Sequence, residues 1–500
     1  MWLVVVQVLL SSTFLIIYFG LKYQYNHWKR KQIPYVASNV LDLDWYNLPE
    51  VKYYSQIYHR LEGHKFGGFY HKFVPKMMVR HPELIKRILI KDFDHFYKRV
   101  GSVVYDEKKP LTMHLFHAYG PFWKKLRIKL TPTFTSVKIK YMFSLMEECA
   151  KDLNEKMEEQ IRIDDTIDVK EYTLRYTIEV ISSCAFGLKA CTIQDGSSIF
   201  RSMALSISDS SLLKRLLANI ATIFPWVKKI LGLYLSDKLA IDFFYNLTKD
   251  LVNYRRNNSV SRNDFFQLLL NMRDDDDQQK SQKQRGDSLA MNDELMAAQC
   301  FLFFVAGFDT SNLVLSGALF ELALQADIQK KLQDEIDEYL QKYDDKITYE
   351  MVKSMPYLNQ VVSEAMRMYP ILGSLSRVCA RDYQIPNTDV VIEEGTEVYI
   401  PIAGLHSDPQ YFPNPQLFDP DRFKDFESYP GRDAYLPFGD GPKNCIGSRF
   451  GQMTVKLALV YLLRDFNFEP CSMTRIPLEY KPFRVATSVN HEIFLKCSTR

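Results

Sequence analysis

The stretch from Pro437 to Gly447 reads PFGDGPKNCIG and decides the fold. Two prolines and two glycines precede Cys445, a composition that predicts a rigid turn. Apolar residues then recur at helical spacing, in a set that starts one position after the cysteine: Ile446, Phe450, Met453, Leu457 and Val460. Cys445 is therefore expected at the start of an amphipathic helix, where free N–H groups stabilise a thiolate. Without this loop, a lone cysteine would be interpreted as an inert core residue.

This loop resembles the haem-binding signature of the cytochromes P-450, Phe-x-x-Gly-x-Arg-x-Cys-x-Gly, through Phe438, Gly441, Cys445 and Gly447. The resemblance implies that Cys445 is the axial ligand of a haem b iron and that its thiolate favours O–O bond cleavage. It also places Phe438 beside the haem. Lys443 stands where the family has arginine, so a flexible point charge is expected in place of a forked donor to a haem propionate.

The longest predicted helix covers residues 293 to about 325 and has apolar side chains on every side, which indicates burial. At 1.5 Å per residue it would be roughly 50 Å long. A second membrane span is the alternative interpretation. The apolar run contains Gln299 and is cut by Asp309, so a core helix is preferred.

Inside this helix, the sequence Ala306-Gly307-Phe308-Asp309-Thr310 places polar groups in a core, where they are costly. Thr310 can donate back to the Ala306 carbonyl and Gly307 weakens the same turn, so we expect a groove that admits water. The motif resembles the family's oxygen-activation motif. This implies that Thr310 steadies reduced oxygen and water beside Ala306 and the haem, while Asp309 helps to deliver protons. The alternative is that Thr310 only satisfies itself and Asp309 pairs with a distant base.

A carboxylate and two arginines form a further match. Glu364 and Arg367 lie three positions apart on one helix face, as in the family's Glu-x-x-Arg motif. The resemblance adds Arg422 and implies a buried structural network behind the haem, in which arginine supplies forked bonds to the carboxylate.

Propionate-binding residues are also implied by the resemblance. Trp123 and Arg127 match the family's Trp-x-x-x-Arg, in which the indole N–H and the guanidinium bind a propionate. Arg377, seven residues after Pro370, is expected to bind a propionate as well, and Arg99 is a weaker candidate.

The first 20 residues carry no charge, and about 20 such residues span a bilayer as a helix. Basic residues follow this run at Lys22 and at 29–31, so we expect residues 1–20 to be an uncleaved membrane anchor with the body in the cytoplasm, at the endoplasmic reticulum. A cleaved signal peptide is the alternative. Residues 21–34 would be a basic flank and hinge, and a loose one because only Pro34 stands there; residues 35–500 would form a single catalytic domain.

Composition supports a globular protein, with 47% apolar and 25% charged residues, and the net charge of +3 gives no argument for nucleic-acid binding. The eight cysteines include no CxxC pair, so reduced thiols are expected. Residues 273–288 contain no apolar residue and are predicted as a solvated connector. Residues 389–392 and 396–400 predict a hairpin. The predicted fold is mainly α with a minor β part, the cytochrome P-450 fold.

The implied function is a haem-thiolate monooxygenase that takes electrons from NADPH through NADPH cytochrome P-450 reductase, with cytochrome b5 as an optional second donor. Basic residues around the proximal motifs could steer these partners: Lys124, Lys125, Lys129, Lys443 and Arg449. Residues 126–136 and 450–453 resemble the insect microsomal detoxifying group, which implies small hydrophobic substrates such as plant toxins or insecticides.

The pocket is expected to be lined by residues 100–118, 202–226, 301–310 and 371–376. Other functions stay open. They are oxidation of an endogenous hormone, terpenoid or fatty acid, a haem-thiolate isomerase or dehydratase without a reductase, and a non-catalytic membrane haem carrier.

Overall fold

The computed structural model describes residues 2–38, 44–71, 73–102, 112–208, 238–281, 289–482 and 486–500. Helices dominate these residues: α1 (Trp2–Tyr25), α2 (His27–Arg30), α3 (Asp44–Asn47), α4 (Glu50–Arg60), α5 (Pro82–Lys86), α6 (Gly120–Leu130), α7 (Ser136–Ile161), α8 (Val169–Phe186), α9 (Ile199–Ser208), α12 (Lys238–Asn257), α13 (Phe265–Ser281), α14 (Asp293–Leu324), α15 (Ala326–Lys342), α16 (Tyr349–Ser354), α17 (Pro356–Met368), α18 (Ile402–His406) and α19 (Ser448–Asp465). The strands are short: β1 (Phe66–His71), β2 (Val74–Val79), β3 (Thr166–Asp168), β4 (Leu375–Val378), β5 (Tyr383–Gln384), β6 (Val391–Ile392), β7 (Glu397–Ile400), β8 (Phe466–Pro470) and β9 (Phe494–Thr499). The mainly α fold with a minor β part is confirmed.

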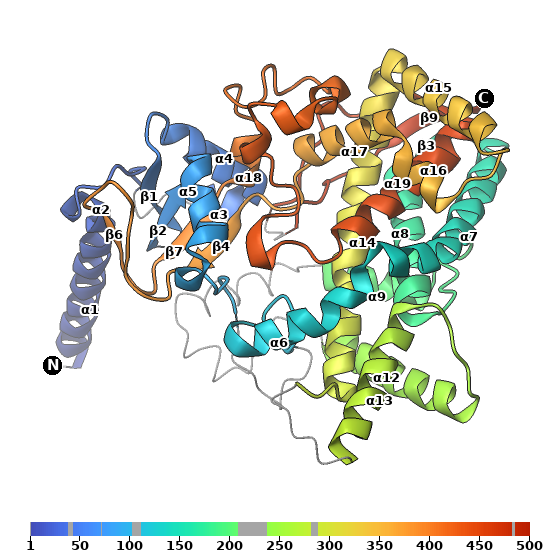
Figure 1. The fold of residues 1–500 in the computed structure, drawn as a ribbon. Helices are drawn as coiled ribbons and strands as arrows, with labels where there is room; N and C mark the ends of the chain where they lie inside the picture. The colour runs from blue at the N-terminus through green and yellow to red at the C-terminus, as the bar shows by residue number, and fades with distance from the viewer. Residues whose placement is uncertain are drawn as a thin grey trace.

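Helix α14 runs through the helical part of the molecule and packs against α8, α12, α17 and α19 (Figure 1). The side chain of Asn292 accepts a hydrogen bond from the Leu295 N–H and so caps its first turn. Helix α14 is long and apolar enough to cross a membrane, by length and composition. Because 67% of its most apolar window is buried inside the protein, it is a core helix, as predicted.

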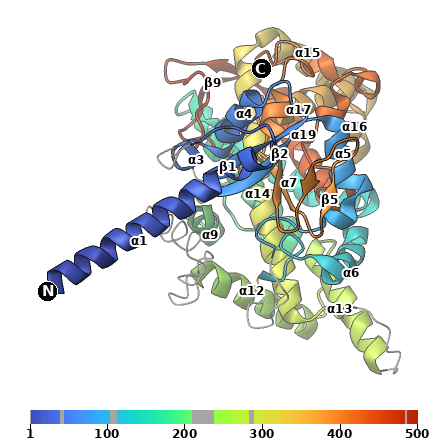
Figure 2. The same cartoon turned by 90° about the vertical axis from the view of Figure 1, so that its left-hand side faces the viewer.

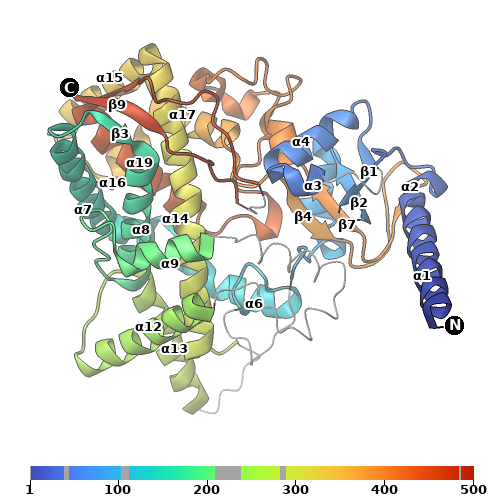
Figure 3. The same cartoon turned by 180° about the vertical axis from the view of Figure 1, so that it is seen from behind.

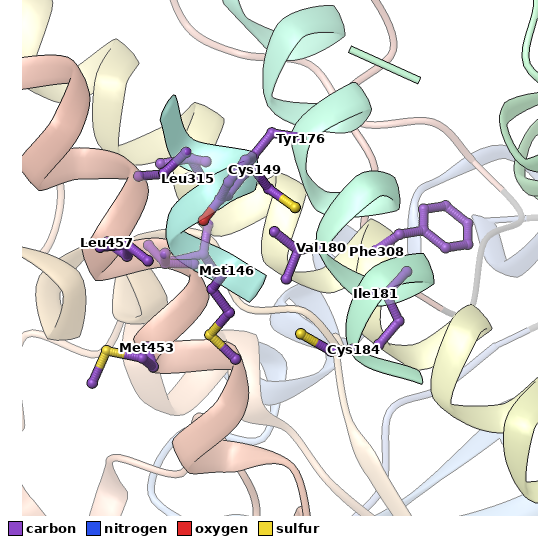
Figure 4. Packing of buried hydrophobic residues seen from close by; sticks show 14 of the residues in the cluster. Met146, Cys149, Tyr176, Val180, Ile181, Cys184, Phe308, Leu315, Met453 and Leu457 are labelled. Carbon is purple, nitrogen blue, oxygen red and sulfur yellow. The ribbon is translucent and has the colours of Figure 1, made fainter. Parts of the chain in front are cut away.

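Side chains from several helices form the core around α14 (Figure 4). Its members include Met146 and Cys149 from α7, Tyr176, Val180, Ile181 and Cys184 from α8, Phe308 and Leu315 from α14, and Met453 and Leu457 from α19. Full burial of a large apolar side chain contributes about 1.5–3 kcal/mol. These contacts therefore fix α14 against α19, the helix that follows the cysteine loop.

A four-stranded sheet with the order β1-β2-β7-β4 forms the core of the N-terminal region, at the other side of the molecule from α7 and α8 (Figure 1). The predicted hairpin of residues 389–392 and 396–400 is wrong. Strand β6 pairs with β5, whereas β7 lies between β2 and β4. The reason is that Gly395, with φ of 84°, turns the chain away, and Val398 and Ile400 are fully buried in the larger sheet. A third sheet, β3-β9-β8, lies beside α7 and α8 (Figure 3).

Helix α1 extends away from the body of the protein (Figure 2). The segment after it packs against strand β1. Trp28 is buried, and its indole N–H donates to the Phe69 carbonyl at 3.2 Å. A Cβ at Gly68 would lie 2.3 Å from the Trp28 ring, so glycine is required for this contact. The Tyr70 hydroxyl also donates to the Tyr25 carbonyl at 2.7 Å.

The predicted connector at residues 273–288 is also wrong in its first part, because α13 continues to Ser281. Arg273 is buried and pairs with the carboxylate of Asp293. Asp276 is buried and pairs with Lys129 at 2.5 Å. Both charged side chains form ion pairs with tertiary partners that the local sequence does not reveal. Residues 282–288 lie outside the described residues.

Candidate active site

The cysteine loop consists of a 3-10 turn, Gly441–Lys443, followed by Cys445 and then α19. The Cys445 N–H donates to the Phe438 carbonyl at 2.9 Å, and the Asp440 side chain accepts from the Gly441 N–H at 2.7 Å. Gly441 has a φ of 71°, and a Cβ there would lie 2.0 Å from the Leu89 carbonyl oxygen. Gly447 is the N-cap of α19, which begins at Ser448. The apolar pattern predicts a helix that begins at Ile446, so the observed helix begins two residues later.

The Cys445 thiol lies among protein atoms that remove water and raise its pKa. The N–H of Gly447 and the guanidinium groups of Arg127 and Arg99 oppose this effect and lower the pKa. The residue is nevertheless exposed, so it borders a space that solvent can enter. A thiol in this position can reach a ligand, and the nearby N–H and cations favour its thiolate form.

Four cations surround the cysteine loop. Arg99 donates through Nη2 to the Lys443 carbonyl at 2.6 Å. Arg127 donates to the backbone and side-chain oxygens of Asn444, at 3.0 and 2.7 Å. Arg377 lies on β4 and is buried. The fourth cation is Lys443 itself.

Burial and neighbouring positive charges lower the pKa of three of these cations. Loss of water and the neighbouring charges lower the pKa of Arg99 to about 10, of Arg377 to about 9 and of Lys443 to about 6. Among the described residues, none of the four forms an ion pair with a carboxylate. The Nε of Arg377 is buried and has no hydrogen-bond partner in this part of the chain. A buried cation cluster with an unpaired guanidinium nitrogen fits a group that carries carboxylates, such as a haem with its two propionates.

Within this cluster, the ammonium group of Lys443 has a backbone partner. Its Nζ donates to the Ala118 carbonyl at 2.9 Å and lies 4.6 Å from the centre of the Trp123 ring. Only 3% of Lys443 is exposed. The side chain therefore connects the cysteine loop to the segment before α6.

The second motif lies on α14. The Thr310 hydroxyl donates to the Ala306 carbonyl at 2.7 Å, and the helix stays continuous through this turn. Ala306 is exposed and Thr310 half-buried, although most of α14 is buried. The open face of the helix is therefore at these two residues. Gly307 has a packing role, since a Cβ there would lie 2.6 Å from the Ile181 side chain of α8.

Asp309 is half-buried on the same turn. Its charge raises the pKa of Lys170, against the larger effect of burial, which lowers it. Lys170 donates to the carbonyls of Val489 and His491, at 3.1 and 2.7 Å. Asp309 therefore adds negative charge in the region of Lys170, after the larger contributions of Asp168 and Glu492.

The two motifs meet where α19 packs on α14. A Cβ at Gly451 would lie 3.8 Å from the Ser311 hydroxyl oxygen, so the first turn of α19 touches the residue after Thr310. The Cys445 loop and the open face of α14 are thereby held on neighbouring elements. The structure brings together residues that lie 135 positions apart in the chain.

The carboxylate network is formed by Glu364, Arg367 and Arg422. Arg367 donates to both Glu364 oxygens, at 2.7 and 2.8 Å, and Arg422 Nε lies 3.3 Å from Glu364 Oε1. The three side chains are 0%, 2% and 6% exposed. Backbone carbonyls accept from further donors of the arginines. The Nη1 of Arg367, for example, donates to the His406 carbonyl at 2.8 Å. The network joins α17 to the segment that precedes the cysteine loop.

Three site features differ from the sequence interpretation. Asn444 was not predicted, although its position beside Cys445 was a signal. Arg99, the weaker candidate, is as close to the cysteine loop as Arg127. Lys129 and Lys443 cannot steer a partner as predicted, because Lys129 is paired with Asp276 and Lys443 is buried. Of the pocket segments, residues 103–111 and 209–226 lie outside the described residues.

Comparison with known proteins agrees with this geometry. A family model described as Cytochrome P450 matches residues 38–495. The chain is 38% identical over 496 residues to Cytochrome P450 6k1 of Blattella germanica, covering 95% of this chain and 93% of that protein. It is 36% identical over 500 residues to Probable cytochrome P450 6a13 of Drosophila melanogaster, covering 98% of each. Cytochrome P450 6A1 of Musca domestica is 36% identical over 495 residues, which cover 96% of this chain and 95% of that protein. The chain therefore belongs to the cytochrome P-450 family, and it is a haem b monooxygenase that receives electrons from NADPH through a reductase.

Proposed function

We propose that this enzyme oxidises small hydrophobic foreign compounds, such as plant toxins and insecticides, with Cys445 as the axial thiolate of the haem iron. One observation carries the assignment of the site. The exposed Cys445, in the loop before α19, and the open Ala306–Thr310 face of α14 lie on neighbouring elements, next to a buried cation cluster that has no carboxylate partner among the described residues.

Haem supplies, when bound, an iron that activates O2 with two electrons from NADPH. Arg99, Arg127 and Arg377 would hold its propionates, with Trp123 beside them, and their charges would thereby be neutralised. Phe438 would fix the loop through its bond to the Cys445 N–H, which keeps the sulfur in place. Lys443 would act on the propionates indirectly, because its ammonium group donates to the Ala118 carbonyl.

Protons would reach the reacting oxygen through Thr310 and Asp309. The Thr310 hydroxyl donates its hydrogen to Ala306, so its oxygen is left with acceptor capacity for a water or an O–H group on the open face. Asp309 would pass protons from the Lys170 side of the helix to that water. Glu364, Arg367 and Arg422 would have a structural role, because all three are buried and pair with one another.

A membrane anchor at residues 1–20 is part of this proposal. Helix α1 has 24 residues, about 36 Å at 1.5 Å per residue, and its first charged residue is Lys22. The basic residues that follow favour a cytoplasmic body, residues 35–500, at the endoplasmic reticulum. Exposed Lys124 and Arg449 remain candidates to steer the reductase or cytochrome b5.

A carbon monoxide difference spectrum of the reduced protein, followed by a product screen with reductase and NADPH, tests the proposal. We expect a thiolate-type spectrum that Cys445→His abolishes, and oxidised products from plant toxins or insecticides. A normal spectrum in Cys445→His would overturn the ligand assignment. Turnover without reductase would instead favour the isomerase, and products only from hormones, terpenoids or fatty acids would favour an endogenous role.

A further inference from the structure

This inference rests on the proposed function and concerns Gln299, the amide that interrupts the apolar run of α14. Gln299 is fully buried. Its Oε1 accepts from the Leu115 N–H at 3.0 Å, and its Nε2 donates to the carbonyls of Met113 and Leu295, at 3.4 and 3.2 Å. One side chain of α14 therefore satisfies the polar backbone groups of a segment 184 positions earlier in the chain.

That segment, residues 113–118, is held at its other end by the cysteine-loop cations. Arg99 donates through Nη1 to the Phe116 carbonyl at 3.2 Å, and Lys443 donates to the Ala118 carbonyl at 2.9 Å. The segment thus spans from α14 to the cysteine loop. Gln299 holds the end that is farther from Cys445 in this set of contacts.

The segment lies on the same face of α14 as Ala306. Gln299 and Ala306 are seven residues apart, which places them on the same face, about 10 Å apart along the helix axis. Gln299 is covered by residues 113–115, whereas Ala306 is exposed. The cover therefore ends between these two positions. Phe116, next along the segment, is 40% exposed.

We propose that Gln299 is a positioning residue for substrate selectivity: it fixes residues 113–116 as a wall on the α14 face that carries Ala306, at Gln299, which lies about 10 Å from Ala306 along the helix axis. Such a wall admits compact hydrophobic substrates to the Ala306–Thr310 turn and excludes elongated ones. Without the amide, two segments packed by apolar contacts alone could slide, because apolar contacts are not directional. The pocket would then accept longer ligands.

Gln299→Met tests this inference, because methionine keeps the size and removes the hydrogen bonds. The chain offers a matched control in Gln329. This residue is also buried, accepts from the Phe468 N–H at 2.9 Å, and donates to the carbonyls of Leu322 and Phe468, at 3.0 and 2.8 Å. Gln329→Met removes the same kinds of bond between α15 and β8, away from the site.

The measurement is the dissociation constants of phenylimidazole and biphenylylimidazole for the ferric haem protein, read from the optical shift. In Gln299→Met we expect the ratio of the two constants to change about fivefold or more in favour of the longer ligand, because hydrogen bonds to the wall are lost. In Gln329→Met the ratio should stay as in the unmodified protein. An unchanged ratio in Gln299→Met, or equal changes in both variants, would overturn the proposal.

Hydrogen exchange in the unmodified protein tests the role of Gln299 even when the Gln299→Met variant does not bind haem. The Leu115 N–H should exchange far more slowly than the neighbouring Phe116 N–H, for which no partner is found among the described residues. Equal, fast exchange of both would contradict the proposal. Neither measurement needs turnover, so a lack of oxidised products would count against the proposed function and not against the role of Gln299.

Discussion

The Nζ of Lys443 donates a hydrogen bond of 2.9 Å to the carbonyl oxygen of Ala118, 325 positions earlier in the chain. The bond is buried and lies beside the Trp123 ring, 4.6 Å from the ammonium group. Arginine is usual at this position in the family. In this chain the residue joins the cysteine loop to the segment that covers α14, so its loss is expected to affect both.

Lys443→Met should lower the free energy of unfolding by about 1–3 kcal/mol, because it leaves the buried Ala118 carbonyl without a donor. Haem retention should fall with it. Lys443→Arg keeps a donor and should retain haem as well as the unmodified protein does, whereas Lys443→Glu should weaken retention by placing a negative charge beside the propionates. Haem content after gel filtration measures all three. Full haem content in Lys443→Glu would remove Lys443 from the site.

Glu364→Ala should abolish haem incorporation, because it leaves Arg367 and Arg422 as buried charges without a carboxylate. Breaking a buried pair by removing one partner costs about 3–5 kcal/mol. The control is Asp334→Ala, which removes a carboxylate from the exposed pair with Lys330 and should leave assembly unchanged. The ratio of haem absorbance to protein absorbance reports the outcome, and a normally assembled Glu364→Ala protein would contradict the structural role.

Thr310→Ala should consume NADPH while it forms little product, because the hydroxyl oxygen that accepts from water on the open face is gone. We expect product formed per NADPH to fall about tenfold or more, a smaller effect than the roughly 10²–10⁴-fold that general acid–base groups can contribute. Thr310→Ser keeps the hydroxyl and its bond to Ala306, so it should restore most of the coupling. Equal coupling in Thr310→Ala and the unmodified enzyme would exclude this role.

Stability should depend on pH through Glu321, a buried carboxyl that accepts a 2.5 Å hydrogen bond from Tyr369. Burial raises its pKa, and Glu364 adds to this effect, while the bonds from Tyr369 and Gln325 and the charge of Arg367 oppose it. The folded protein therefore holds this proton more tightly than the unfolded chain. The resulting stabilisation is complete below the ordinary glutamate pKa and is lost as pH rises through the folded value.

Glu321→Gln cannot ionise and should keep that stability, so its melting temperature should exceed that of the unmodified protein increasingly as pH rises. The control is Glu350→Gln. Glu350 is exposed, and its hydrogen bond from Lys140 lowers its pKa, so any difference in melting temperature should have the opposite sign and should disappear as pH falls through the folded pKa. Parallel pH profiles of Glu321→Gln and the unmodified protein would contradict the prediction.

The predictions from sequence held where the signal is local. Residues around Cys445 carry their own turn chemistry, since glycines at 439 and 441 adopt positive φ and Asp440 caps the turn. The long helix was predicted within one residue of its observed end, Leu324, because its apolar pattern and its cap lie within it. The partner of β7 could not be predicted in the same way. Neighbouring strands in the chain suggested a hairpin, but the larger sheet buries Val398 and Ile400 more completely.

The burial of charged residues also depends on partners from distant parts of the chain. Arg273 and Asp276 looked like part of a solvated connector, yet both are buried because Asp293 and Lys129 come from other elements to pair with them. Sequence by itself determined the haem-thiolate class, through the cysteine loop and the Asp309–Thr310 motif, since turn and helix signals act over a few residues. Only the tertiary structure decided the partners of Lys443 and Gln299, because a buried donor is satisfied by whichever carbonyl the packed helices bring within reach.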